Sequence, residues 1–281
     1  MIKTYRPYTK SRRNMTSINY RGVLTESEPH KALTYGRKRD VGRDGAGLVS
    51  VRHKGGGHKR LFRAIDFRFL KHDISATITS VEYDPNHSSF ISLATYTDGT
   101  KTYVLTPREL KVGDKFIVSD KADIKVGNRL PLRKITVGTF VFNVEIYPDG
   151  GAKLVRSAGN FAQVLSNDAG YTNLKMPSGE VRKVSENCWA TVGAASNDEH
   201  ALVAFGKAGR SRWKGIRPTV RGTAMNPVDH PYGGGEGRQG RGMRRAKSLW
   251  GKPTGGHKTR KPKKYSNIFR VSRRPKKLRK G

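Results

Sequence analysis

The sequence predicts an all-β protein with two small barrels in tandem, an OB-fold followed by an SH3-like barrel, between long basic extensions. Three observations lead to this prediction. The 281-residue chain has a formal net charge of +34, yet residues 61–200 carry 17 Lys and Arg against 16 Asp and Glu. Apolar residues in that middle segment alternate with polar ones in short runs, and turn-forming residues separate the runs. The middle can therefore collapse around cores, whereas the ends repel themselves unless a polyanion neutralises them.

The N-terminal extension, residues 1–60, is expected to form an extended basic arm. Pro7, Pro29 and eight glycines interrupt any periodic pattern, and apolar residues are too sparse to build a core. The first 25 residues are basic and contain no Asp or Glu, which is also the composition of an organellar transit peptide. Both interpretations stay open on composition alone.

The first barrel is placed at residues 61–125 as an OB-fold domain. Ile65, Phe67 and Phe69 alternate with polar residues, which predicts a first strand. Four further runs, rich in β-branched or aromatic residues and bounded by turn signals, lie at residues 74–83, 89–96, 101–105 and 115–119. Five short strands are the number found in an OB-like barrel.

The second barrel is placed at residues 126–200 as an SH3-like domain. Its predicted strands lie at residues 136–146, 152–156, 161–166, 171–176, 180–184 and 188–192. The short loops argue against βαβ units, which need a helix between parallel strands. After these strands, Ser196-Asn197-Asp198-Glu199 is a capping box and predicts a short helix that carries Ala201, Leu202 and Phe205.

The C-terminal extension, residues 201–281, carries 24 Lys and Arg against two acids and holds 14 of the 32 glycines. Such a segment is expected to be disordered alone and to become ordered on a nucleic acid. Each cation that meets a phosphate releases counterions, so binding should be tight and steeply salt-dependent. Solvated basic tails are the plain alternative, but tails that only aid solubility do not need glycines beside Trp213 and Trp250.

Several functional classes are excluded by composition. Cys188 is the only cysteine, which excludes a disulfide framework and a Cys-based zinc site. No apolar run approaches the ~20 residues needed to span a bilayer. There is no apolar segment near Met1, so a secretory signal is not expected.

Three motifs suggest enzyme chemistry but lack the required context. Residues 55–60 resemble a phosphate loop, yet the Gly-Lys-Ser/Thr ending is missing and no strand precedes them. Residues 235–240 match the dinucleotide fingerprint, but prolines and glycines stand where the strand should be. Asp229 and His230 are adjacent, and the nearby hydroxyls show no elbow motif for a nucleophile. We therefore expect no enzymatic activity.

Trp213 lies in a basic run, Arg210 to Lys214, that combines a stacking surface with phosphate-binding cations. Stacking of bases on aromatic rings, together with cations, is how proteins hold unpaired RNA. Packing of Trp213 against the second barrel is the alternative.

Residues 220–231, Val-Arg-Gly-Thr-Ala-Met-Asn-Pro-Val-Asp-His-Pro, and residues 233–238, Gly-Gly-Gly-Glu-Gly-Arg, closely resemble a known signature. The signature is that of the second universal protein of the large ribosomal subunit, bacterial type (ribosomal protein family uL2). Supporting matches lie at residues 12–16, 53–59, 82–86, 156–159, 179–184 and 206–209. Because the match begins near residue 12, the resemblance argues against a transit peptide.

The resemblance implies an OB-fold domain followed by an SH3-like domain, with both extensions threaded into large-subunit (23S-type) rRNA. It implies a position near the peptidyl transferase centre and roles in subunit association, tRNA binding and peptide-bond formation, without catalysis by the protein. His230 matches the family histidine, whereas Tyr232 stands where a second histidine is usual, so a mechanism that needs both imidazoles is in doubt.

Partners implied are large-subunit rRNA, small-subunit rRNA at the intersubunit face, and other ribosomal proteins, with no membrane and no homo-oligomer. No cofactor is expected, and the only ion considered near the protein is structural Mg²⁺ of the rRNA. The expected location is the cytoplasmic ribosome, with an organellar ribosome as the alternative.

The expected RNA contacts combine the basic runs, the glycine loops and the aromatic and amide side chains of these motifs. They are Arg12, Arg13, His53, Lys54, Gly55, Gly56, Gly57, His58, Lys59, Arg68, Arg156, Lys207, Arg210, Arg212, Trp213, Lys214, Arg217, Arg221, Asn226, Asp229, His230, Tyr232, Gly233, Gly234, Gly235 and Arg238. Two rival hypotheses are a nucleic-acid-binding module outside the ribosome, such as a chromatin or RNA-chaperone protein, and an RNA-processing enzyme that uses Asp229 and His230.

Overall fold

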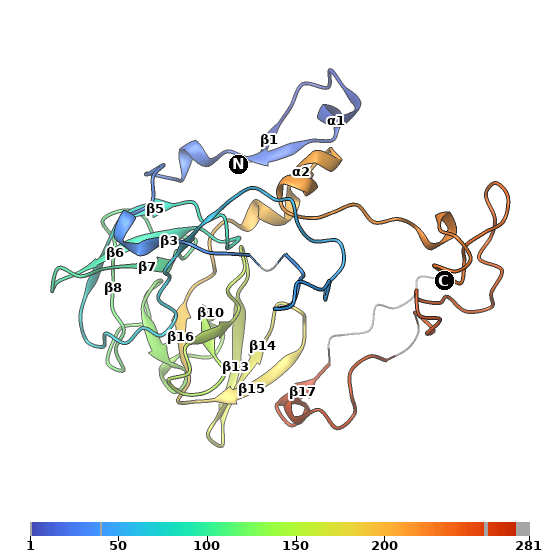
Figure 1. Cartoon of the computed structure of the whole chain (residues 1–281). Coiled ribbons are helices and arrows are strands. Elements are labelled where there is room, and N and C mark those ends of the chain that lie inside the picture. The colour runs from blue at the N-terminus through green and yellow to red at the C-terminus, as the bar shows by residue number, and fades with distance from the viewer. Residues whose placement is uncertain (1, 40, 256–257, 274–281) are drawn as a thin grey trace. The chain divides into compact units, whose positions relative to one another are not determined.

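The computed structural model describes residues 2–39, 41–255 and 258–273 (Figure 1). The chain divides into two compact units. The first unit draws on Met1–Lys38, Lys59–Lys207 and Ile268–Gly281. The second unit combines Arg39–His58 with Ala208–Asn267. Part of the N-terminal extension and most of the C-terminal extension therefore fold together, which no sequence pattern indicated.

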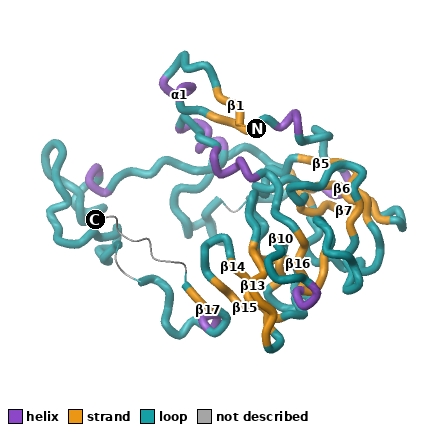
Figure 2. Tube along the Cα trace, turned by 180° about the vertical axis from the view of Figure 1, so that it is seen from behind, coloured by secondary structure: helices purple, strands orange, loops and turns teal. Residues whose placement is uncertain are grey.

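The first unit contains the two barrels, and the all-β fold class with tandem barrels is confirmed. Figure 2 shows many strands and little helix in the described chain. The first barrel is built on an antiparallel sheet in the order β7-β6-β5-β8. Its strands are β5 (Ala76–Glu82), β6 (Ile91–Tyr96), β7 (Lys101–Leu105) and β8 (Lys115–Phe116). All four lie within predicted runs.

The run from Ile65 to Phe69 is not a regular strand, so this prediction is wrong. The Oδ1 atom of Asp66 accepts the backbone N–H groups of Arg68 (2.8 Å) and Phe69 (2.9 Å), which turns the chain. Ile65 keeps a single parallel bridge to Tyr103. The first strand before this turn is instead β4 (Leu61–Arg63), which pairs with β3 (Thr34–Gly36).

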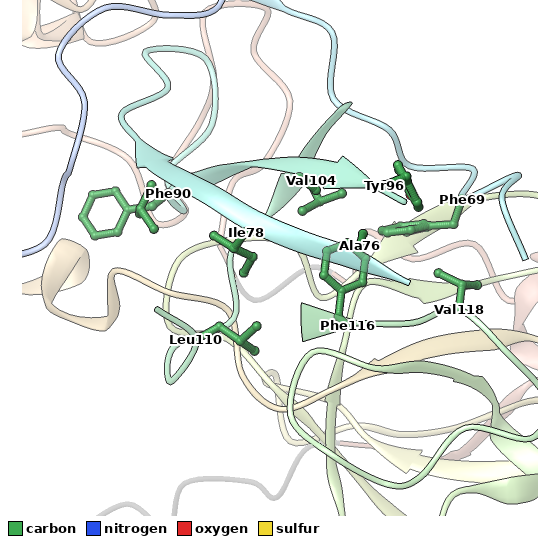
Figure 3. Close-up of a cluster of buried hydrophobic side chains, with 12 residues drawn as sticks. Phe69, Ala76, Ile78, Phe90, Tyr96, Val104, Leu110, Phe116 and Val118 are labelled. Carbon is green, nitrogen blue, oxygen red and sulfur yellow. The ribbon is translucent and has the colours of Figure 1, made fainter. Parts of the chain in front are cut away.

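Apolar side chains from all four strands fill the first barrel (Figure 3). Ala76 and Ile78 come from β5, Tyr96 from β6, Val104 from β7 and Phe116 from β8, and each is buried. Full burial of one such aliphatic or aromatic side chain stabilises a fold by roughly 1.5–3 kcal/mol. The near-neutral charge of this segment lets these contacts form without opposing repulsion.

The second barrel is built on a seven-stranded antiparallel sheet in the order β17-β15-β14-β13-β10-β16-β9. Its strands are β9 (Arg129–Pro131), β10 (Phe140–Phe142), β13 (Ala162–Asp168), β14 (Tyr171–Lys175), β15 (Val181–Ser185), β16 (Trp189–Val192) and β17 (Arg270–Ser272). A separate ribbon pairs β11 (Val144–Glu145) with β12 (Ala152–Leu154). Cys188 lies in the core, where burial raises the pKa of its thiol to about 12.

Three features of the second sheet depart from the predicted strands. The strand β9 lies before the first predicted run of the second barrel, where no strand was expected. The run 136–146 is broken at Asn143, which has a φ of 54° and separates β10 from β11. The strand β17 was not predicted, because the basic tail shows no alternation. It pairs with the edge strand β15, and the N–H of Lys183 donates to Phe269 O at 2.9 Å.

The capping box at Ser196 does not form. Ser196 is buried, and its hydroxyl accepts the N–H of Phe90 at 3.1 Å and contacts the Ser89 hydroxyl at 2.9 Å. With the hydroxyl engaged there, residues Asp198–Leu202 form only a 3₁₀ helix, and Asn197 before it has no side-chain cap. A tertiary contact has therefore outcompeted the local helix signal.

The described helical segments are short. The α-helices are α1 (Lys10–Arg13) and α2 (Ala208–Trp213), and 3₁₀ turns lie at Tyr20–Gly22, Lys31–Leu33, Leu132–Lys134, Asp198–Leu202, Gly222–Ala224 and Tyr265–Asn267. In the described part of the chain, no helix combines the length and apolar character that a membrane crossing requires.

The N-terminal residues are held to the barrels by specific hydrogen bonds. The buried Tyr103 hydroxyl donates to Glu82 Oε2 at 2.6 Å and accepts the N–H of His30 at 2.7 Å. Farther upstream, β1 (Ile2–Thr4) pairs with β2 (Thr16–Ile18). The N–H of Thr16 then donates to Ala204 O at 3.0 Å.

A buried ion pair joins the two barrels. Arg129 and Glu145 are each 1% exposed, and Nη2 lies 3.0 Å from Oε1. The guanidinium also donates to Asn143 O at 2.7 Å and lies 4.4 Å from the centroid of Phe69, a side chain of the first core. The second carboxylate oxygen accepts the N–H of Trp189 at 3.1 Å. Burial lowers the pKa of Arg129 to about 10, so it stays charged at neutral pH.

Arg129→Met should lower the free energy of unfolding of the full chain by about 3–5 kcal/mol, because Glu145 is left buried without a counter-charge. Arg133→Met is the control, since Arg133 pairs with Asp120 at the surface and its loss should cost about 1 kcal/mol or less. Adding Glu145→Leu to Arg129→Met should recover part of the lost free energy of unfolding. Urea titration followed by circular dichroism measures all three, and equal effects of the two arginine variants would contradict the assignment.

Candidate nucleic-acid interface

In the second unit, the glycine loop at 53–58 runs beside the basic and aromatic run at 213–217. The N–H of Gly55 donates to Gly215 O at 2.9 Å, and the N–H of His58 donates to Trp213 O at 2.9 Å. The N–H of Arg217 donates to His53 O at 3.0 Å. The structure thus brings together two predicted RNA-contact segments that lie about 160 residues apart in the chain.

Gly57 permits this close approach. A Cβ atom at Gly57 would lie 2.7 Å from both the Cα and the N atom of Gly215, so no other side chain fits without moving the backbone. Gly55 and Gly56 have positive φ angles of 124° and 64°, and nothing lies closer than 3.5 Å to a Cβ built at either position. A Cβ at Gly55 or Gly56 would therefore lie at ordinary van der Waals distance from the Arg217 or Arg212 side chain, while Gly57 serves backbone packing.

The helix α2 carries the cations of the predicted Trp213 run. Arg210 and Arg212 lie on its last turn, and Trp213 ends it with 59% of its surface exposed. Lys214 and Arg217 follow in exposed positions. This exposure favours the stacking interpretation of Trp213 over the core-packing one.

The loop at 222–235 is folded tightly on itself. The N–H groups of Asp229 and His230 both donate to Asn226 O, at 3.0 and 3.3 Å. The N–H of Gly233 donates to His230 O at 2.8 Å, and that of Gly234 to Met225 O at 3.0 Å. The side chains of Asp229 and Asn226 are exposed, as are those of Arg221 and Arg238 on either side of the loop.

Glycines make this folding possible. A Cβ at Gly233 would lie 2.1 Å from Asn226 O, one at Gly234 would lie 2.6 Å from Pro227 Cγ, and one at Gly235 would lie 2.5 Å from Gln239 Cδ. Gly233 and Gly234 therefore act first as packing elements of the loop, whereas the flexible Gln239 side chain can move away from a Cβ at Gly235.

His230 is fixed in orientation. Its Nδ1 atom accepts the N–H of Tyr232 at 3.0 Å, which makes Nε2 the protonated nitrogen of the neutral ring. The ring lies over Gly222, where a Cβ would come within 2.6 Å of three ring atoms. The side chain is thus held by backbone on two sides.

Tyr232 connects this loop to the next segment of the chain. Its ring lies 4.8 Å from that of His230, and its hydroxyl accepts the N–H of Lys247. The guanidinium of Arg241 lies 5.7 Å from the ring centroid. The sequence singled out Tyr232 but not Arg241, which carries no motif.

The expected contacts in the first unit are spread over it. Arg12 on α1 lies 5.8 Å from the ring centroid of Tyr5 and 5.9 Å from that of Tyr8. Arg156 lies 4.4 Å from the centroid of Phe67. The remaining members are exposed, and they are Arg13, Lys59, Arg68 and Lys207.

Charge distinguishes the second unit. Its residues, 39–58 and 208–267, carry 20 Lys and Arg against four Asp and Glu. The described residues contain no group of three or more His, Cys, Asp or Glu side chains placed to hold a metal ion. The arrangement of exposed cations, an exposed glycine and exposed rings suits phosphate and base contacts.

Two family models match the chain. The model for Ribosomal Proteins L2, RNA binding N-terminal domain, matches residues 30–119, and that for Ribosomal Proteins L2, C-terminal domain, matches residues 125–251. Together they cover more than half of the chain.

The chain belongs to the ribosomal protein L2 family.

The expected family is therefore confirmed. As a member of this family, the chain is a structural, RNA-binding constituent of the large ribosomal subunit, where it binds rRNA and has other ribosomal proteins as neighbours. The C-terminal family model includes α2, the loop at 222–235 and Trp250, so the family sequence extends well past the two barrels.

Gly57→Ala should disrupt the pairing of 53–58 with 213–217, because the added methyl group meets the Gly215 backbone. Loss of two backbone hydrogen bonds should speed proteolysis of these segments about tenfold and weaken RNA binding. Gly45→Ala is the matched control, since nothing lies within 4 Å of a Cβ there. Mass spectrometry of limited digests locates the cuts, and equal digestion of both variants would refute this role of Gly57.

Tyr232→Phe should loosen the link between the loop and Lys247. Removing the hydroxyl removes the acceptor for the Lys247 N–H, which at about 1 kcal/mol corresponds to roughly fivefold faster amide exchange. Hydrogen exchange of the free full chain measures this, with Tyr265→Phe as a control at an exposed ring. Unchanged exchange at Lys247 in Tyr232→Phe would contradict the assigned link.

Proposed function

We propose that this ribosomal protein grips large-subunit rRNA chiefly through its second unit, near the peptidyl transferase centre. The single observation that carries the proposal is the convergence of the 53–58 and 213–217 segments in a unit with 20 cations and four acids. The first unit supplies a rigid platform for the remaining contacts. The protein thereby supports subunit association, tRNA binding and peptide-bond formation through architecture.

Most contacts go to phosphate and sugar in this proposal. Lys54, Lys214, Arg217, Arg221 and Arg238 are exposed and meet phosphates. Gly56 is exposed, so a phosphate can approach the backbone there beside Arg212, and Trp213 stacks on an unpaired base. Structural Mg²⁺ belongs to the RNA, and the protein itself needs no cofactor.

An architectural role for His230 is supported by its geometry. A general base needs a free ring nitrogen within reach of the reacting proton, but Nδ1 already accepts the Tyr232 N–H. The remaining Nε2–H is a donor that can hold an RNA oxygen. Tyr232 adds an aromatic ring beside His230 and a hydroxyl that accepts the N–H of Lys247.

The wider partners belong to the same proposal. The protein meets small-subunit rRNA at the intersubunit face, does not form homo-oligomers, and works in the cytoplasmic ribosome, with an organellar ribosome as the alternative. During sedimentation through high-salt sucrose, the rival RNA chaperone would dissociate from large particles, whereas an integral subunit protein stays bound to them.

Tethered cleavage tests the position. Cys188→Ser removes the only cysteine, and Val228→Cys, at a site 90% exposed beside His230, then carries an iron chelate that cuts nearby RNA. In reconstituted large subunits, we expect cuts at nucleotides of the peptidyl transferase centre. Val137→Cys, 61% exposed in the first unit, is the control and should cut elsewhere. Cuts from Val228→Cys only at remote helices would overturn the proposed position.

His230→Gln tests the absence of catalysis in the same particles. A general acid or base contributes about 10²–10⁴-fold to a rate, so a catalytic His230 should cost at least about a hundredfold in peptide-bond formation. We expect less than about a tenfold loss in particles that sediment normally. A larger loss in normally assembled particles would support the enzymatic hypothesis instead.

A further inference from the structure

A small hairpin in the second unit presents Trp250 at its tip. The N–H of Ser248 donates to Lys252 O at 2.8 Å, and the N–H of Thr254 donates to Ala246 O at 2.6 Å. The N–H of Gly251 closes the turn on Ser248 O at 3.0 Å. The first side of the hairpin, residues 246–249, is partly buried and the second side, residues 252–254, is exposed, and Trp250 at the tip is 70% exposed. Large aromatic side chains usually bury their surface, so an exposed ring leaves apolar area available to a partner.

Arg52 orients the exposed ring. Its guanidinium lies 5.3 Å from the centroid of Trp250, within the range of a cation–π contact. Arg52 directly precedes His53, whose carbonyl oxygen accepts the N–H of Arg217. The ring is therefore attached to the same backbone framework that carries Trp213. At the other side of the hairpin, the N–H of Lys247 donates to the Tyr232 hydroxyl.

The positive charge around the Trp250 ring favours a polyanion as its partner. Glu236 is the last acidic residue in the sequence, and the segment 237–281 contains many Lys and Arg but no Asp or Glu. We propose that Trp250 is a stacking site for an unpaired nucleobase, with Arg52 on the opposite face of the indole. This inference rests on the proposed RNA-binding role of the second unit and assigns it a second stacking residue.

A nucleobase fits these features better than other polyanions. A free phosphate or an acidic peptide satisfies the cations but gains little from an indole ring. A planar base gains from the ring face, and stacking on an aromatic side chain typically contributes about 1–3 kcal/mol per base. An anionic lipid surface also attracts Trp beside Lys, but the chain belongs to a family of RNA-binding proteins.

Fluorescence of Trp250 alone tests the proposal directly. In full-length protein with Trp189→Phe and Trp213→Phe, Trp250 is the only tryptophan left. We expect a short oligoadenylate to quench its emission, and an abasic strand of the same length to bind without quenching. Equal quenching by the two strands would overturn the proposal. A blue shift with phosphatidylserine vesicles and no response to oligoadenylate would overturn it in favour of a membrane.

Affinity provides a second measurement. Trp250→Leu should weaken oligoadenylate binding about tenfold and leave binding of the abasic strand unchanged. Arg52→Ala should weaken it less, and Arg52→Lys should restore part of the effect because the cation is kept. Tyr265→Leu, at a ring with 72% exposure in the same unit, is the matched control. An equal loss of oligoadenylate affinity in Tyr265→Leu would mean that any exposed ring supports binding, and it would overturn the specific role of Trp250.

The outcomes separate this inference from the proposed function. If wild-type protein binds neither strand, the RNA-binding role of the second unit fails. If wild-type protein and Trp250→Leu bind both strands equally, RNA binding stands and the stacking site alone is refuted.

Discussion

The buried pair of Arg129 and Glu145 is the contact on which the first unit depends. Neither charge reaches water, so the pair is tolerated only because the two side chains bind each other and nearby backbone groups: the guanidinium donates to Glu145 and to Asn143 O, and the carboxylate accepts the N–H of Trp189. The hydrogen bond to the carbonyl oxygen of Asn143 explains the left-handed φ of Asn143 and the break in the predicted strand at that residue. The cation also faces the Phe69 ring of the first core, so one side chain fixes the barrels to each other. The N-terminal residues, held by Tyr103, and the strand β17 are attached to this rigid base.

The sequence predicted the barrels well because side-chain alternation reports directly on which face of a strand is buried. The prediction of local elements from the sequence was wrong where a polar side chain could form hydrogen bonds with alternative partners. Asp66 accepts N–H groups two and three residues ahead and ends an alternating run that looked like a strand. Ser196 binds Phe90 rather than the start of a helix, although its local motif indicated a cap. Both errors arise from competition between hydrogen bonds, which a periodic pattern does not record.

The candidate interface was predictable in chemistry but not in geometry. Counts of Lys, Arg, Gly and Trp located the relevant segments, because composition alone determines where a polyanion is needed. The pairing of 53–58 with 213–217 had no local signal, since neither segment alternates. Gly57 was expected to contact RNA, and the structure shows that its missing side chain leaves room for the backbone of Gly215. Which RNA atoms these residues meet stays a prediction.

The second unit has to hold its shape with 20 cations and four acids, and the three buried apolar clusters of the described residues all lie in the first unit. Backbone hydrogen bonds and close glycine contacts supply part of the order. Aromatic rings supply another part, as in the contacts of Arg52 with Trp250 and Arg241 with Tyr232. A carboxylate would orient the same cations but would also cancel their charge and repel phosphate. A ring attracts a cation through its quadrupole and leaves the net charge intact, so the arginines are positioned while they remain available to RNA. On this argument, a phenol ring at Tyr232 suits the unit because it anchors two neighbouring segments without changing the local charge.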